Sequence, residues 1–263
     1  MFRKIHILTR YDNEPKRTKR IQTAQQQLIN ICLQAGCKVV DHAQDADIIL
    51  ALGGDGTVLS AAQLAIQHNK PIAGIYAGKL GFLTGYKLEE PENITELLLR
   101  HNKAQYLNTI CVQHNQQTYY AINECLLHRM PNEQIGHVSI EIENEQFQVS
   151  VDGMMLTTAT GSSGYALSAG GPLMHPSSNH LLLVAVAPHS LNARPMILPD
   201  DASIRMKQLS NVGSLYIDGV KVAMVSKDDT ITCHNADKTL KIHHPDNYNY
   251  YQRVIQKLHW QSS

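Results

Sequence analysis

The sequence lacks the residue patterns that mark several large classes of protein. Its five cysteines are odd in number and include no Cys-x-x-Cys pair, so we expect reduced thiols rather than a disulfide framework. None of its 14 histidines forms a His-x-x-x-His or Cys/His cluster, so the residues predict no metal site. Lysine plus arginine and aspartate plus glutamate are balanced at 23 each, which favours neither nucleic acid nor an anionic membrane as a partner.

Long apolar segments are also missing. The longest apolar run covers residues 181–187 and is too short to span a bilayer. Residues 9–12 are already polar, which comes too early for the apolar region of a signal peptide. With 263 residues, of which 43% are hydrophobic, the chain can bury a sizeable core as one large or two modest domains. We therefore expect a cytoplasmic globular protein without membrane contacts.

The first hundred residues alternate between two hydrophobic periods. Buried strands are expected at 5–8, 39–40, 48–52 and 71–75, and helical spacing occurs at 21–35, 58–68 and 94–100. Strands that alternate with helices predict a parallel sheet built from β-α-β crossovers. Residues 1–103 are therefore expected to form an α/β domain that binds a nucleotide or phosphate.

The sequence after residue 103 has a different pattern. Residues 104–247 are expected to form a mainly antiparallel, β-rich domain, because short alternating segments are separated by polar turns such as Asp218-Gly219. Residues 250–258 return to a helical pattern, so a helix within 248–263 is expected to pack back on the first domain. The alternating segments are 107–113, 118–122, 138–142, 147–151, 182–186, 215–217, 220–225 and 230–233.

Neither of the two common glycine-rich nucleotide motifs, Gly-x-x-x-x-Gly-Lys-Ser/Thr and Gly-x-Gly-x-x-Gly, occurs in the sequence. Instead, Gly53-Gly54-Asp55-Gly56-Thr57 joins an apolar strand to a helix-like stretch. Glycines bring backbone amides close to phosphate oxygens, and the helix N-terminus adds its positive dipole end. Because a carboxylate repels phosphate, we interpret Asp55 as handling a hydroxyl that attacks a phosphoryl group. The alternative is a plain Asp-Gly turn.

A second glycine-rich segment, Gly78–Gly85, follows the next expected strand and therefore opens at the same edge of the sheet. Lys79 can reach a phosphate there, although a solvated surface lysine fits the charge equally well. Phe82 and Leu83 suit the apolar wall of a nucleotide pocket, and the core is the favoured alternative for both.

A third segment, Thr157–Tyr165, combines small hydroxyl residues with glycines ahead of an aromatic ring. Such residues offer many hydrogen bonds to ribose and pyrophosphate oxygens, and Tyr165 is placed to stack on a base; the alternative is an ordinary Gly/Ser loop. Asn123-Glu124 and Asp152-Gly153 each close a β segment, where their side chains can face a cleft. Each pair considered alone favours a turn.

These segments together resemble the NAD kinase family, and the matches occur in family order. The Gly-Gly-Asp-Gly turn alone is weak, because diacylglycerol kinases and phosphofructokinases carry similar turns, whereas the match over residues 160–172 is far more specific. The matching motifs are Gly53–Thr57, Gly78–Thr84, Asn123-Glu124, Asp152-Gly153, Thr160–Tyr165, Ser168–Pro172 and Pro188–Pro195.

The resemblance implies transfer of the γ-phosphoryl group of ATP to the 2′-hydroxyl of the adenosine ribose of NAD, which gives NADP and uses a divalent cation, usually Mg²⁺. It implies that Asp55 is the catalytic acid that accepts or orients the hydroxyl proton, and that the protein is a homo-oligomer, either a tetramer or a dimer. His137 matches a position near the ligand only loosely. The residues expected to bind ATP or NAD are Gly53, Gly54, Gly56, Thr57, Lys79, Phe82, Asn123, Glu124, Asp152, Thr160, Gly161, Ser162, Ser163, Gly164, Tyr165 and Ser168.

Three departures from the family pattern bear on the expected site. Ala159 replaces a proline, which lowers loop rigidity, and Ser163-Gly164 replaces Thr-Ala, which removes a methyl contact. Tyr76-Ala77 replaces Asn-Thr and bears on how the phosphate edge is lined.

Two rival functions remain. The first is a lipid or sugar kinase with the same turn, although the sequence shows no convincing amphipathic membrane segment. The second is a protein that senses NAD or NADP without catalysis, for which Asp55 would have no use.

Overall fold

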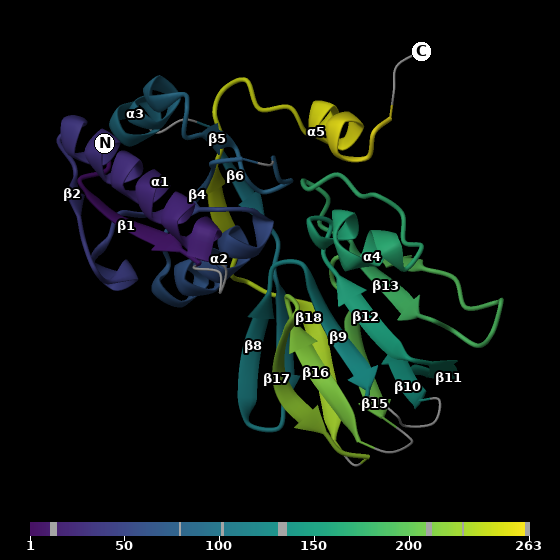
Figure 1. Cartoon of the computed structure of the whole chain (residues 1–263). Helices are drawn as coiled ribbons and strands as arrows, with labels where there is room; N and C mark the ends of the chain where they lie inside the picture. The colour runs from purple at the N-terminus through teal and green to yellow at the C-terminus, as the bar shows by residue number, and fades with distance from the viewer. Residues whose placement is uncertain are drawn as a thin grey trace. The chain divides into compact units, whose positions relative to one another are not determined.

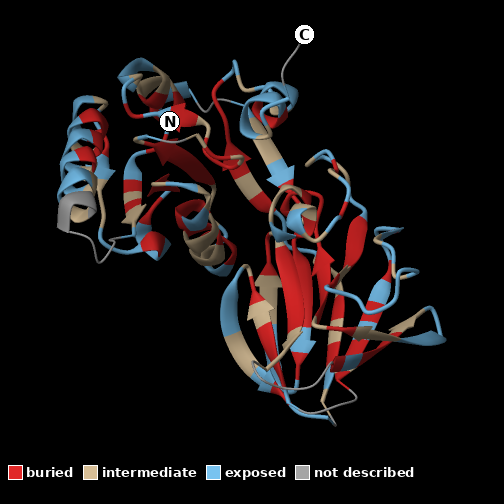
Figure 2. Ribbon diagram, turned by 45° about the vertical axis from the view of Figure 1, so that its right-hand side comes forward, coloured by how far each residue is buried: buried red, intermediate tan, exposed pale blue. Residues whose placement is uncertain are grey.

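The structure is a computed structural model that describes residues 1–10, 15–78, 80–100, 103–130, 136–208, 212–227 and 229–260. The chain divides into two compact units, one formed by Met1–Tyr106 with Leu240–Ser263 and the other by Leu107–Thr239. Figure 1 draws the helices and strands of both units, and Figure 2 shows that each unit has buried strands at its centre.

A mostly parallel sheet of seven strands forms the centre of the first unit. Strands β3 (Ile48–Leu52) and β4 (Ile72–Tyr76) are buried at every residue, as expected for parallel strands that are covered on both faces. The strand order is β2-β1-β3-β4-β19-β6, with β5 paired to β4. The other strands are β1 (Lys4–Thr9), β2 (Lys38–Val39), β5 (Tyr86–Lys87), β6 (Ala104–Leu107) and β19 (Leu240–His243).

Helices supply the apolar side chains that cover this sheet. Leu28 and Ile31 from one helix and Ile94 and Leu97 from another share one buried cluster with strand residues such as Ile5. The helices of the unit are α1 (Pro15–Gln34), the 3-10 turn η1 (Ala43–Asp45), α2 (Asp55–His68), α3 (Pro91–Arg100) and α5 (Tyr250–Lys257). None of the helices in the described residues has the length and apolar character needed to span a bilayer.

Two features of the first unit differ from the expectation. Helix α2 begins at Asp55 rather than at Val58, so the acid occupies the first helical position. Residues 240–243, which were expected within the β-rich domain, instead form strand β19 between β4 and β6, where Ile242 pairs with Ile72 in parallel register. The first difference makes Asp55 part of the helix that follows β3, and the second brings the chain after β19 next to β4.

The second unit is a sandwich of two antiparallel sheets. Residues of both sheets, such as Ile204 and Ile231 of one and Leu156 and Leu215 of the other, share a single buried core. The first sheet has the order β11 (Glu145–Val151), β10 (Gly136–Ile142), β15 (Ser203–Gln208), β18 (Thr230–Asn235), β7 (Ile110–His114) and β8 (Gln117–Ala121). The second has the order β14 (Met196–Leu198), β13 (Leu181–Val186), β12 (Gly153–Thr157), β9 (Glu124–Arg129), β16 (Gly213–Ile217) and β17 (Val220–Val225).

The predicted fold class is confirmed, since an α/β part with a mostly parallel sheet is followed by an antiparallel, β-rich part. The short turn η2 (Gly161–Ser163) and helix α4 (Tyr165–Ser168) follow β12 in the second unit, at the place of the predicted Gly/Ser-rich segment.

Candidate active site

The loop between β3 and α2 carries the predicted acid. Gly53 must be glycine, because a Cβ there would overlap the side chain of Thr57. Gly54 is the N-cap of α2 and is exposed, as is Gly56, so the backbone at the start of this 14-residue helix is open to solvent. A helix N-terminus with accessible backbone favours anions such as phosphate.

The carboxylate of Asp55 is held by the backbone of the second glycine-rich segment. Its Oδ2 accepts the amide of Phe82 and its Oδ1 accepts the amide of Leu83, both at 2.9 Å. Gly81 allows this approach, because a Cβ at that position would overlap the carboxylate. A carboxylate can accept about four hydrogen bonds, so these two fix its orientation and leave capacity for a substrate hydroxyl.

The same segment is held against the sheet. Gly81 donates its amide to the Thr84 hydroxyl at 2.8 Å, and Gly74 of β4 allows close contact, because a Cβ there would lie 2.8 Å from the Leu83 carbonyl oxygen. Leu83 is buried and Phe82 is half-buried, which places Leu83 in the core and leaves part of Phe82 accessible. Lys79, a predicted phosphate contact, lies outside the described residues.

In the second unit, the backbone of the predicted Asn123-Glu124 pair is held by an aspartate from another turn. The carboxylate of Asp218 accepts the amides of Ile122, Asn123 and Glu124 at 2.7–3.2 Å. Asp218 lies between β16 and β17 with a φ of 48°, and the turn was recognised in the sequence only as a separator of strands. The capture of three successive amides makes Asp218 the residue that orients Asn123 and Glu124.

Glu124 is a buried acid. Burial, together with the nearby charge of Asp218, raises the pKa of Glu124 to about 7. Its Oε2 atom is buried and has no hydrogen-bond partner among the described residues. An unsatisfied buried carboxyl oxygen is uncommon and marks a place where a ligand atom would be stabilising.

The Thr157–Gly164 segment lies directly against this pair. The hydroxyl of Thr157 donates to the Asn123 carbonyl at 2.8 Å, and that of Thr158 donates to the Ile122 carbonyl at 2.6 Å. Gly161 permits the contact, because a Cβ there would overlap the Asn123 carbonyl oxygen. The structure therefore brings together two of the predicted segments, which are more than thirty residues apart in the sequence.

The departure at Gly164 falls at the same place. A Cβ there would lie 3.5 Å from Asn123 Nδ2 and 3.8 Å from Glu124 Oε2. The same Cβ would lie 3.1 Å from the Gly161 carbonyl oxygen, which is tighter than an ordinary contact, so a methyl group at residue 164 would require the backbone at Gly161 to shift slightly.

The predicted hydroxyl ligands of this segment do not all face solvent. Ser162 is fully buried, and its hydroxyl donates to the Ala159 carbonyl at 2.6 Å while accepting the Met174 amide at 2.9 Å. Thr160 is also buried, Ser163 is half-buried and donates to the Thr160 carbonyl, and Tyr165 and Ser168 are exposed. The hydroxyl of Ser162 therefore fastens the loop to residue 174.

Asp152 has a partner of its own in the second unit. Arg129 Nε donates to Asp152 Oδ1 at 2.5 Å, and this hydrogen bond lowers the pKa of the Asp152 carboxyl. His137, which matches the family position near the ligand only loosely, is exposed on β10. Its Nδ1 lies within hydrogen-bond distance of the Ser150 hydroxyl, at 2.9 Å.

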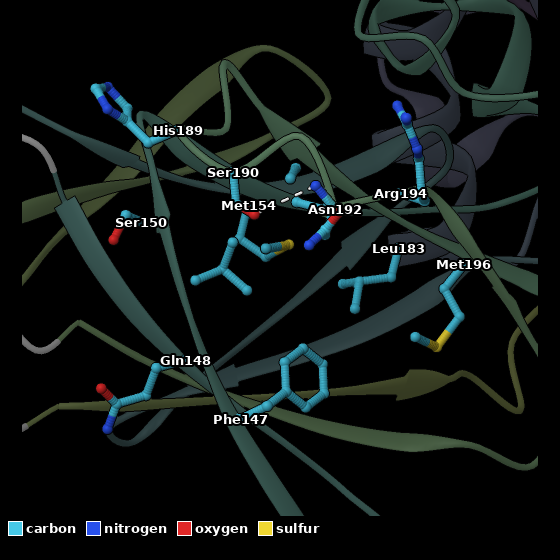
Figure 3. A pocket seen from close by; sticks show the side chains of 13 residues that line it. Phe147, Gln148, Ser150, Met154, Leu183, His189, Ser190, Asn192, Arg194 and Met196 are labelled. Atoms are coloured by element: carbon cyan, nitrogen blue, oxygen red, sulfur yellow. Dashed lines mark hydrogen bonds between the residues drawn. The ribbon is translucent and has the colours of Figure 1, made fainter.

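A cavity of about 540 Å³ lies elsewhere on the second unit (Figure 3). Phe147, Met154 and Leu183 give it an apolar wall, and the backbone amide of Asn192 donates to the Ser190 hydroxyl at 3.2 Å beside it. None of the residues predicted to bind nucleotides lines this cavity; Ser190, Asn192 and Arg194 belong to the Pro188–Pro195 motif.

Two family models match the chain. The model of the ATP-NAD kinase N-terminal domain covers residues 8–106, and that of the ATP-NAD kinase C-terminal domain covers residues 122–244. An NAD kinase of Pseudoalteromonas translucida is 36% identical over 250 residues, which are 90% of this chain and 84% of the relative. An NAD kinase of Cupriavidus pinatubonensis is 33% identical over 225 residues, which are 82% of this chain and 74% of the relative.

Solved structures show the same fold at lower identity. A yeast NADH kinase complexed with NADH superposes with a TM-score of 0.85 at 20% identity and covers 99% of this chain and 88% of its own. An NAD kinase from Archaeoglobus fulgidus in complex with ATP gives a TM-score of 0.82 at 19% identity and covers 98% of this chain and all of its own. With both halves matched by family models and relatives above 30% identity over most of their length, the chain belongs to the NAD kinase family.

Proposed function

We propose that the chain transfers the γ-phosphoryl group of ATP to the 2′-hydroxyl of the adenosine ribose of NAD, giving NADP and ADP. Membership of the NAD kinase family supports this reaction, and the relatives named above are NAD kinases. The single observation that carries the chemical step is the carboxylate of Asp55, fixed by two backbone amides at the first position of a helix.

Asp55 is proposed to act on the attacking hydroxyl. A carboxylate is too weak a base to deprotonate a ribose hydroxyl before the reaction, so it accepts a hydrogen bond and aligns the oxygen with the γ-phosphorus. As the new O–P bond forms and the bond between the phosphorus and the ADP oxygen breaks, the hydroxyl proton passes to Asp55. The negative charge of the phosphates is offset by the open backbone at the start of α2, where Gly53, Gly54, Gly56 and Thr57 are proposed phosphate contacts, together with Lys79.

Residues of the second unit are proposed to bind the dinucleotide. Asn123 and Glu124 are held in place by Asp218, and Glu124 presents a carboxyl whose pKa of about 7 lets it either donate or accept a hydrogen bond near neutral pH. The further proposed contacts in this unit are Asp152, Thr160, Gly161, Ser163, Gly164, Tyr165 and Ser168. Phe82 of the first unit is proposed separately as a nucleotide contact. Ser162 is proposed to act through the shape of its loop, since its hydroxyl is buried.

A divalent cation, Mg²⁺ in the usual case, is proposed to accompany ATP. The described residues contain no group of three His, Cys, Asp or Glu side chains that could hold a metal ion. The proposed cation is therefore one bound mainly by phosphate oxygens and water, as Mg²⁺ commonly is. Such an ion would neutralise negative charge on the transferred phosphoryl group.

We also propose that the protein is a cytoplasmic homo-oligomer, a tetramer or a dimer. Apolar side chains of the second unit are exposed, including Leu191 at 87% and Ile197 at 53%, and an interface would cover them. The five cysteines are free and buried, which fits a reducing compartment.

The decisive experiment measures NADP formed from ATP, Mg²⁺ and NAD. We expect Asp55→Asn to keep NAD binding and to lose roughly 10² to 10⁴ in kcat, because the asparagine oxygen can accept only one of the Phe82 and Leu83 amides and the side chain takes no proton. Asp41→Asn is the matched control, since Asp41 is exposed on the same unit. Wild-type protein that binds NAD without forming NADP would favour the sensor, and phosphorylation of a lipid or a sugar in place of NAD would favour the other kinases.

A further inference from the structure

Two consecutive peptide groups connect Asp55 to the C-terminal part of the chain. The peptide that joins Gly81 to Phe82 donates its N–H to Asp55 Oδ2, and its carbonyl oxygen accepts a hydrogen bond from Arg253 Nη1 at 3.0 Å. The next peptide donates the Leu83 N–H to Asp55 Oδ1, and its carbonyl oxygen, that of Phe82, accepts the Tyr248 hydroxyl at 3.3 Å. Each peptide is therefore held at both ends.

Arg253 lies on α5, the yellow helix of Figure 1, and the segment that leads to it runs beside β5. It is only 8% exposed, and no described carboxylate forms an ion pair with its guanidinium. Its centre lies 5.1 Å from the middle of the Tyr248 ring. Burial lowers the pKa of Arg253, and interactions with Tyr248, Tyr76 and Asp55 act in the opposite direction.

Burying a cation without a carboxylate partner is costly, so its position calls for a compensating interaction. The Gly81 carbonyl supplies one directly, and a cation at the carbonyl end polarises the peptide and strengthens the hydrogen bond that its N–H donates. The negative charge of Asp55 at the other end of the same peptide completes the arrangement.

Tyr248 is positioned by its own packing. Its ring stacks on His244 with centroids 3.8 Å apart and an interplanar angle of 11°. His244 directly follows β19, and Gly85 allows it to approach, because a Cβ at residue 85 would lie 2.9 Å from His244 Nδ1. The placement of β19 beside β4 thus carries the C-terminal segment to the loop that holds the acid.

We propose that Arg253 and Tyr248 are positioning residues for Asp55, because they hold the carbonyl ends of the two peptide groups whose amide ends hold its carboxylate. Arg253 touches no substrate in this role; it acts through the Gly81-Phe82 peptide. As a statement about catalysis the inference rests on the proposed function, whereas the contact itself can be tested without activity. The alternative is that Arg253 only anchors α5 to the unit.

The first test uses hydrogen exchange and needs no substrate. In Arg253→Met, we expect the Phe82 amide to exchange at least about tenfold faster than in wild type, because its peptide loses its carbonyl partner. Lys257→Met removes one charge from an exposed position of the same helix and is the matched control, with Phe82 exchange unchanged. Unchanged exchange at Phe82 in a folded Arg253→Met protein would overturn the proposal, whether or not the chain makes NADP.

The second test measures kinetics. Arg253→Met is expected to lose roughly 10- to 100-fold in kcat with little change in KM for NAD, because a misplaced acid impairs the chemical step more than binding. Arg253→Lys should recover part of this loss, since it keeps the charge. A normal kcat in Arg253→Met, in a preparation whose wild type forms NADP, would overturn the inference and leave the proposed function intact.

A double-mutant cycle separates positioning from anchoring. If Arg253 acts through Asp55, then adding Arg253→Met to Asp55→Asn should lower kcat by less than about twofold, because the group it positions has already been lost. An equal loss in both backgrounds would mean that Arg253 acts independently of Asp55, and the proposal would be wrong. Should Arg253→Met fail to fold, Tyr248→Phe removes only the hydroxyl bond to the Phe82 carbonyl and is measured in the same cycle, with Leu83 exchange as its readout.

Discussion

Glu124 should make the stability of the protein depend on pH in a way that one substitution removes. The side chain is 7% exposed, and burial with the nearby Asp218 raises its pKa from 4.5 to about 7. Replacement by glutamine keeps the shape of the protonated form and prevents ionisation. The substitution therefore isolates the contribution of this single charge.

The sign follows from the direction of the shift. Because the folded-state pKa lies above the ordinary value, the folded protein binds this proton more tightly than the unfolded chain does. The stabilising contribution is fully present below about pH 4.5 and is lost as the pH rises through about 7. At about 1.36 kcal/mol for each pKa unit, the loss amounts to about 3 kcal/mol.

The assay is urea denaturation followed by circular dichroism between pH 4.5 and pH 8.5. We expect the free energy of unfolding of the wild type, minus that of Glu124→Gln, to fall by about 3 kcal/mol across this range. Contributions from other titrating groups cancel in the difference. Glu145→Gln, at an exposed position of β11, is the matched control and should give a flat difference.

Two results would refute the reasoning about Glu124. A difference that does not change with pH would mean that the carboxyl ionises as easily in the folded protein as in the unfolded chain. A rise in place of a fall would mean that the folded-state pKa is lowered, as when a cation pairs with the carboxylate.

Two other substitutions test the loops of the site. Gly81→Ala should reduce kcat about as strongly as Asp55→Asn, roughly 10²-fold or more, because the added Cβ would overlap the Asp55 carboxylate. Near-normal turnover would contradict this, because it would show that the loop at residue 81 can move away from Asp55 without loss of activity. Ser162→Ala should lower the free energy of unfolding by about 1–3 kcal/mol, because it removes the hydroxyl that accepts the buried Met174 amide. Ser163→Ala, at the half-buried neighbour, should cost less. Equal losses for the two variants in urea denaturation would contradict this assignment.

The sequence was informative where a local pattern determines a local structure. Strands β3 and β4 are uninterrupted apolar runs followed by glycine-rich turns, so their burial and the position of Asp55 at the end of β3 could be predicted. The start of α2 was placed three residues too late, because glycines at positions 54 and 56 weaken a helical pattern even where the chain is helical.

Contacts between distant segments could not be predicted in this way. Strand β19 alternates polar and apolar residues like an antiparallel strand, yet it pairs in parallel with β4, about 170 residues away. Asp218 was recognised as a turn residue, but its amide contacts depend on the pairing of β16 with β9. Arg253 carries no sequence signal beyond its place on a helix, and its partner Gly81 lies 172 residues earlier.

Two of the acids that are proposed to contact ligands, Asp152 and Asp55, are held in different ways. Asp152 is paired directly with the cation Arg129, which lowers its pKa and makes it a poor acceptor of a proton. Asp55 is instead held by the N–H groups of Phe82 and Leu83, with the cation Arg253 one peptide farther away. Backbone amide donors fix the direction of a carboxylate and leave its remaining lone pairs free to accept a hydrogen bond from a substrate hydroxyl. This arrangement supports the proposal that Asp55 meets the attacking hydroxyl, and the lowered pKa of Asp152 fits a contact that stays ionised.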